Sequence, residues 1–107
     1  MVATQDIEEY CQRIAREFRP ERIILFGSHA YGTPDENSDV DLMVVMPKRP
    51  GGRQEQDIQI RRRVQADFPV DLLVRDPQEV AQRLRENDTF MQVVTQHGRV
   101  MYENGHA

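Results

Sequence analysis

The sequence predicts a small α/β domain, with a mixed β-sheet of three to four strands and helices packed mainly on one face of it. Three short apolar runs rich in Ile, Leu and Val, each bounded by Gly, Pro or charged residues, are typical of buried strands. Longer segments between them repeat apolar residues at helical spacing. A length of 107 residues suits one core, so we expect residues 1–107 to form a single domain.

The first half of the chain contains one predicted helix and two predicted strands. Residues 5–19 are expected to form an amphipathic helix, with Thr4 as its N-cap. Apolar residues recur there at helical spacing: Ile7, Cys11, Ile14 and Phe18. We expect strands at 22–26 and 39–46, joined by a loop of turn-forming residues at 32–38.

The second half alternates helices with short strands. Residues 54–67 are expected to be helical, although their apolar stripe is narrow. A strand is expected at 70–74, followed by a helix whose N-cap is Asp76 with Pro at the first helical position. A further helix at 89–96 and a short last strand at 100–102 complete the pattern.

Composition narrows the class of protein. The single Cys11 cannot form an internal disulfide, and its place on the apolar side of the first helix indicates core packing. No apolar run approaches the ~20 residues that span a bilayer, and the N-terminus lacks a signal pattern, so we expect a cytoplasmic protein away from membranes. A net charge of −4 argues against nucleic acid as a partner.

Two predicted strands carry polar groups suited to a metal-bound nucleotide. Gly27 and Ser28 follow the first strand, where glycine permits a sharp turn and free N–H groups of a short helix would face a phosphate. Asp39 and Asp41 begin the second strand, and their spacing of two directs both carboxylates to one face. Adjacent like charges call for a cation, and hard oxygen ligands favour Mg²⁺.

A third carboxylate, Asp71, interrupts the apolar run of the third strand. If that strand lies beside the second, Asp71 can join Asp39 and Asp41, and three carboxylates are enough to hold two metal ions. The simpler alternative is a surface residue on an edge strand. Asp67 and Asp76 are rival third acids, but both lie at element ends, where caps are more common.

These residues resemble the motif of the polymerase beta superfamily of nucleotidyltransferases. The run G-S-H-A-Y-G-x-x-x-x-x-S-D-V-D-L, with a later Asp on a neighbouring strand, is similar to the minimal nucleotidyltransferases in particular. Members of that group are usually the antitoxin half of a pair with a HEPN-domain toxin. The resemblance extends from Ile23 to about Val74, and the G-S before the acid pair makes it specific.

The resemblance implies a role for each motif residue. Gly27 and Ser28 would bind the triphosphate of ATP, and Asp39 and Asp41 would bind two Mg²⁺ ions and the phosphates. Asp71 would complete one metal site and help to deprotonate the attacking hydroxyl. Family members transfer AMP to a tyrosine of the partner toxin, which implies a hetero-oligomer of this chain with a HEPN-type toxin.

One departure from the family pattern and two alternative functions stay open. Tyr31 occupies a position where many relatives carry Arg, which removes a phosphate-binding cation and bears on rate or substrate. The chain could instead be a non-catalytic antitoxin that neutralises its partner by binding. It could also be a nucleotidyltransferase for a small molecule. The sequence does not identify the nucleotide, the number of groups transferred or the stoichiometry.

Two basic segments allow both a structural and a binding interpretation. Consecutive residues 61–63 are all Arg, but on a helix they fan out over different faces, which favours a solvated surface over an RNA grip. Lys48, Arg49 and Arg53 flank a Gly-Gly loop and could reach the triphosphate.

Overall fold

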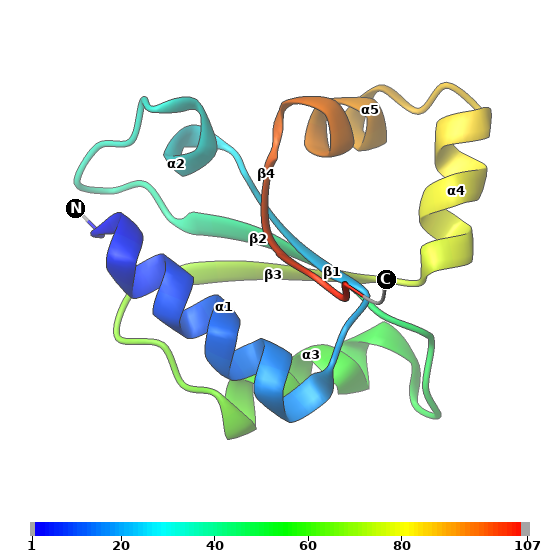
Figure 1. Cartoon of the computed structure of the whole chain (residues 1–107), viewed down its shortest axis with the longest axis horizontal. Helices are drawn as coiled ribbons and strands as arrows, with labels where there is room; N and C mark the ends of the chain where they lie inside the picture. Colours follow the sequence, from blue (N-terminus) through cyan, green and yellow to red (C-terminus); the bar gives the residue numbers. More distant parts are fainter. Residues whose placement is uncertain (1, 106–107) are drawn as a thin grey trace.

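The computed structural model describes residues 2–105, which form a four-stranded sheet and five helices (Figure 1). In chain order the elements are α1 (Thr4–Phe18), β1 (Arg22–Phe26), α2 (Ser28–Tyr31), β2 (Val40–Val45), α3 (Gly52–Arg63), β3 (Val70–Arg75), α4 (Pro77–Arg85), α5 (Thr89–His97) and β4 (Arg99–Glu103). The predicted α/β class and the strand count are confirmed.

The sheet is mixed, with the strand order β3-β2-β1-β4. β1 pairs antiparallel with both β2 and β4, whereas β2 and β3 are parallel. A parallel pair needs a long crossover, and α3 supplies it between β2 and β3. The two strands that carry the predicted acids are therefore direct neighbours, as the sequence interpretation required.

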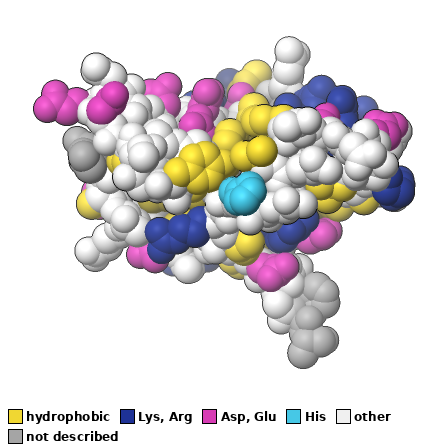
Figure 2. All heavy atoms as spheres, turned by 90° about the horizontal axis from the view of Figure 1, so that it is seen from above, with side chains coloured by type: hydrophobic (Ala, Val, Ile, Leu, Met, Phe, Trp, Pro, Cys, Tyr) yellow, Lys and Arg dark blue, Asp and Glu magenta, His cyan; other side chains and the backbone are white. Residues whose placement is uncertain are grey.

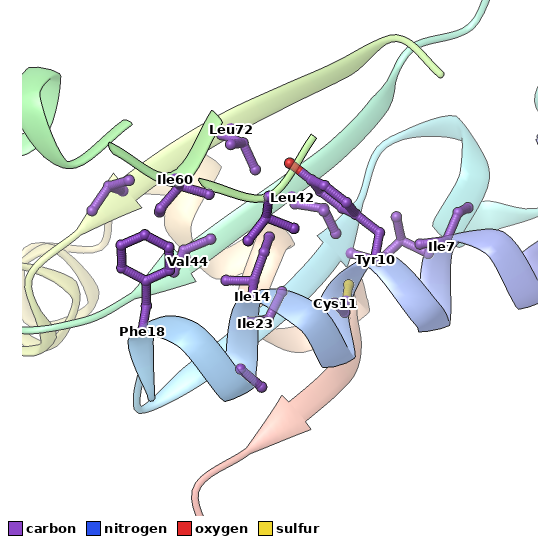
Figure 3. Packing of buried hydrophobic residues seen from close by; sticks show 14 of the residues in the cluster. Ile7, Tyr10, Cys11, Ile14, Phe18, Ile23, Leu42, Val44, Ile60 and Leu72 are labelled. Atoms are coloured by element: carbon purple, nitrogen blue, oxygen red, sulfur yellow. The ribbon is translucent and has the colours of Figure 1, made fainter. Parts of the chain in front are cut away.

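The larger core lies between one face of the sheet and helices α1 and α3. Ile23 and Leu25 of β1 point to this face because side chains alternate along a strand. Figure 3 shows α1 directing its apolar stripe at the strands, with Ile14 and Cys11 in the middle of the cluster. Cys11 is fully buried, in agreement with its predicted packing role.

The opposite face carries a second, smaller core under α4 and α5. Ile24, Met43 and Val45 form its floor, and Val80 and Met91 cover them from the two helices. The expectation that the helices pack mainly on one face therefore needs correction, because the last two helices cover the other side. Figure 1 shows α5 and α4 on the side of the sheet away from α1 and α3.

Helix ends differ from the expectations where the sequence carries no strong capping signal. The predicted helix 54–67 starts two residues earlier and stops at Arg63, where Val64 turns to an extended conformation and enters the larger core. Ala3, rather than Thr4, is the N-cap of α1. The predicted N-cap at Asp76 is confirmed, because its carboxylate accepts a hydrogen bond of 2.8 Å from the Gln78 N–H.

The last strand is longer than expected and covers Arg99–Glu103. Among residues 2–105, no helix combines the length and the apolar character that crossing a membrane requires.

Candidate active site

The acids of β2 and β3 lie opposite each other in the sheet. In the parallel register Asp41 pairs with Asp71, so both side chains leave the same face. On the other side of Asp41, Phe26 is its partner in β1. Neighbouring strands are about 4.8 Å apart, which puts the two carboxylates within reach of one ligand. Asp41 is half-buried and Asp71 is exposed.

Gly27 turns the chain away from β1 directly against Asp41. Its backbone has φ 75° and ψ −161°, a conformation that is essentially restricted to glycine. A Cβ built there would overlap the Asp41 carboxylate, with Cγ only 3.1 Å away. The turn after β1 and the acid of β2 are thus packed together, and a side chain at position 27 would separate them.

The short helix α2 begins at Ser28 and continues from this turn. The Gly27 carbonyl accepts hydrogen bonds from Ala30 N–H at 3.0 Å and Tyr31 N–H at 3.2 Å. The N–H groups of Ser28 and His29 precede these bonds, and a helix does not use its first N–H groups internally. They are the donors that the sequence interpretation assigned to a phosphate.

Asp39 stands just before β2, not inside it as expected, and its side chain is exposed. The preceding loop is held by its own polar groups, since Asp35 Oδ1 accepts hydrogen bonds from Asn37 N–H at 2.8 Å and Ser38 Oγ at 3.2 Å. The Asp39 carbonyl lies 3.1 Å from Nδ1 of His29. This contact joins the loop to α2.

The three carboxylates act on one another. Burial raises the pKa of Asp41 above its ordinary value, and the charges of Asp71 and Asp39 raise it further, while His29 opposes this shift. A carboxylate that is half-buried beside two others is destabilised in its charged form. A bound cation relieves that repulsion, so the electrostatics favour a positively charged ligand.

The carboxylates of the site suit a divalent cation in their chemistry, although they do not form a ready metal cluster. Within residues 2–105, no three His, Cys, Asp or Glu side chains converge in the arrangement of a ready metal cluster. The donor set still suits a hard divalent cation, because it consists of carboxylate oxygens under mutual repulsion. Asp41 and Asp71 are in register for a shared ion, and Asp39 adjoins them at the strand start.

The rival acids take no part in this site. Asp76 is at the other end of β3, where it caps α4 and accepts a hydrogen bond of 2.9 Å from the Lys48 N–H. Asp67 is an exposed loop residue ahead of β3. Lys48 and Arg53 follow the far end of β2, and Arg53 pairs with Glu79 at 3.3 Å, so this loop lies away from the acid pair.

Two of the three arginines at 61–63 contact neighbouring residues of the fold. Arg61 pairs with Asp57 at 2.8 Å, and Arg63 lies 5.9 Å above the Phe18 ring. Arg61 also donates a hydrogen bond of 3.2 Å to the Val70 carbonyl, next to Asp71. Together with Asp39, Arg61 and Val70 line a pocket of about 500 Å³. This pocket includes Asp39 but neither Asp41 nor Asp71, so Arg61 lies beside the start of β3 on the sheet face that α3 covers and does not reach the acid pair.

An apolar wall borders the site on the other side. Phe26, the register partner of Asp41, meets Phe90 of α5 edge-on with 5.6 Å between ring centroids. Phe90 and Val93 remain well exposed. Figure 2 shows apolar side chains gathered in the middle of the side that carries α2 and α5. The sequence interpretation missed Phe90 because its contact joins segments far apart in the chain.

Part of this chain is similar in sequence to a known protein. Over 38 residues the chain is 45% identical to a Methanocaldococcus jannaschii protein that is provisionally assigned as a protein adenylyltransferase. That match covers 36% of this chain and 38% of the relative, so it spans well under two thirds of the relative's length.

Two solved structures share the fold. A Sulfolobus solfataricus crystal structure, provisionally assigned as a nucleotidyltransferase, aligns with a TM-score of 0.64 and 20% identity, over 94% of this chain and 79% of that one. A toxin–antitoxin crystal structure with AMP-PNP aligns with a TM-score of 0.53 and 28% identity, over 91% of this chain and 73% of its own.

The family model for the nucleotidyltransferase domain matches residues 7–94, which is most of the chain and includes every residue of the site described above. The resemblance carried by the glycine–serine turn and the three acids is thereby confirmed at the level of the family: this chain belongs to the nucleotidyltransferase domain family.

Proposed function

We propose that this chain is an antitoxin nucleotidyltransferase that transfers AMP from ATP to a hydroxyl group, that of a tyrosine, on a partner HEPN-type toxin. The observation that carries the proposal is the Asp41–Asp71 pair, in register on adjacent parallel strands and packed against the glycine turn after β1. The adenylyltransferase relative and the toxin–antitoxin neighbour with AMP-PNP support the direction of this proposal.

The nucleotide would be held at the turn between β1 and α2. Free N–H groups at the start of α2 would donate to the β- and γ-phosphates, and the Ser28 hydroxyl would add a further donor. Gly27 would let the phosphates approach the backbone closely, since no Cβ stands in the way. This arrangement would place the α-phosphorus beside the acids of β2 and β3.

Asp39, Asp41 and Asp71 would together hold two Mg²⁺ ions. When bound, the ions would neutralise the carboxylate repulsion and stabilise charge that develops on the phosphates. Asp41 is the central acid because it lies between Gly27 and Asp71.

In the reaction, the tyrosine oxygen would form a bond to the α-phosphorus while the bond between the α-phosphorus and the bridging oxygen breaks. Asp71 would accept the hydroxyl proton, and pyrophosphate would carry away the bonding electron pair. Asp71 suits this role because its side chain is exposed at the edge strand β3, where a partner's side chain can approach. The same exposure at Asp39 suits a macromolecular acceptor better than an enclosed small molecule.

The test is the intact mass of the partner protein after incubation with this chain, Mg²⁺ and each nucleoside triphosphate in turn. We expect a mass increase of one or more AMP groups with ATP. The rate should fall by at least about a hundredfold in Asp41→Asn, because the substitution removes the charge that the reaction depends on.

Asp67→Asn is the matched control, since Asp67 is an exposed acid outside the site. Full activity of Asp41→Asn would refute the assignment of the acids. A stable complex that silences the partner without any mass gain would instead identify a non-catalytic antitoxin.

A further inference from the structure

His29 makes a contact that none of the assigned roles uses. It lies in α2, two residues after Gly27, and its Nδ1 is 3.1 Å from the Asp39 carbonyl oxygen, ten residues further along the chain. A carbonyl oxygen can only accept a hydrogen bond, so Nδ1 must carry the proton and donate it. In the neutral ring this leaves Nε2 unprotonated.

The other ring nitrogen is unusual. Nε2 of His29 is buried and has no hydrogen-bond partner within residues 2–105. A buried polar atom without a partner destabilises the folded protein, and such atoms are rare enough in folded proteins that each calls for an explanation. An aromatic hydrocarbon ring would fill similar space without that cost. Stability alone therefore does not account for a histidine at this position.

The Nδ1 contact links the two halves of the site. His29 belongs to the turn and helix assigned to the phosphates, whereas Asp39 directly precedes β2, the strand that carries Asp41. A second link exists where Gly27 packs against the Asp41 carboxylate. Two contacts, instead of one, therefore hold the turn with the phosphate donors against the segment that carries Asp39 and Asp41.

We infer that His29 is a positioning residue, whose Nδ1–H donates to the Asp39 carbonyl and so fixes the spacing between the glycine–serine turn and the acids of β2. This role rests on the proposed nucleotidyl transfer. It acts through Asp39 and does not require His29 to touch the nucleotide. A misplacement of about 1 Å at a reacting centre can reduce a rate roughly a hundredfold, so a clamp of this kind has a measurable effect.

Two substitutions separate positioning from packing. His29→Phe keeps a ring but removes the donor, and we expect kcat for AMP transfer to fall roughly tenfold to a hundredfold while the midpoint of thermal unfolding stays equal or rises. His29→Asn keeps an N–H donor near the Nδ1 position, and we expect it to restore most of the activity. His97→Asn is the control, because His97 is an exposed histidine at the end of α5.

Three results would overturn the inference: wild-type activity in His29→Phe, equal losses in His29→Asn and His29→Phe, or a lowered unfolding midpoint that accounts for the loss. The ring tautomer gives a reading that does not depend on catalysis. Long-range ¹H–¹⁵N spectra of the wild type should show His29 protonated at Nδ1, and protonation at Nε2 alone would overturn the clamp. If the wild type transfers nothing to any partner, the proposed function fails and the tautomer alone decides whether the clamp exists.

Discussion

A methyl group at Gly27 would test the link between the turn and the acid pair. Gly27→Ala places a non-glycine residue at φ 75° and ψ −161°, which costs about 1–3 kcal/mol of folding free energy. The new Cβ would also overlap the Asp41 carboxylate and force it to move. For a domain near this size, 1 kcal/mol lowers the midpoint of thermal unfolding by about 4–8 °C.

Gly32→Ala is a matched control for this substitution. Gly32 also has a positive φ, 80°, at the end of α2, but a Cβ there would meet nothing within 4 Å. Its cost is the left-handed backbone strain alone, about 1–2 kcal/mol. The difference between the two variants therefore contains the contact with Asp41 together with the extra backbone strain at ψ −161°, compared with ψ 21° at Gly32.

The assay combines thermal unfolding with AMP transfer, measured at a temperature below both unfolding midpoints. We expect Gly27→Ala to lose more stability than Gly32→Ala and to lose nearly all transfer, whereas Gly32→Ala keeps most of it. Equal stability losses together with normal transfer by Gly27→Ala would refute the reasoning, because Asp41 would then not depend on the close approach of the turn.

Two further predictions concern groups outside the site. Burial raises the pKa of the Cys11 thiol to about 12, so a thiol reagent at pH 8 should label the folded protein far more slowly than protein unfolded in guanidinium; rapid labelling of the folded form would contradict the core assignment. Hydrogen bonds from the backbone N–H groups of Lys48 and Gln78 lower the pKa of Asp76 below 3.8, so its stabilisation is present above that pH and is lost as the pH falls through the lowered value. Unfolding midpoints measured from pH 7 to pH 2 should therefore converge for the wild type and Asp76→Asn in acid, and a constant gap would count against this.

The elements whose ends are marked by a glycine or by a capping side chain were predictable from sequence. β1 has the predicted bounds because apolar residues fill it and Gly27 ends it. The helix starts at Asp76 and Asp88 follow from side chains that accept hydrogen bonds from the first-turn N–H groups, at 2.8 Å from Gln78 and 2.9 Å from Met91. Where such signals are absent, as at the end of α3, the predicted boundary was wrong by several residues.

The side of the sheet that each helix covers was not predictable. The apolar positions of α4 and α5 show that each helix buries one face, but they do not say against which side of the strands. That choice is made by the connections after β3, which bring Val80 and Met91 over Met43. The contact of His29 was not predictable for a similar reason, since its partner Asp39 lies across a loop and leaves no periodic signal.

The two-sided arrangement of helices also explains why the acids are accessible. Alternation along β2 puts Asp41 on the same face as Met43 and Val45, which α4 and α5 cover. Had those helices extended over the start of the strand, Asp41 would be buried in an apolar core with no compensating charge, which is strongly unfavourable. The apolar cover instead ends at the edge-on pair of Phe26 and Phe90, and Phe26 is the register partner of Asp41. One sheet face thus changes within a single strand from core to open acidic site, and the position of α5 sets where that change occurs.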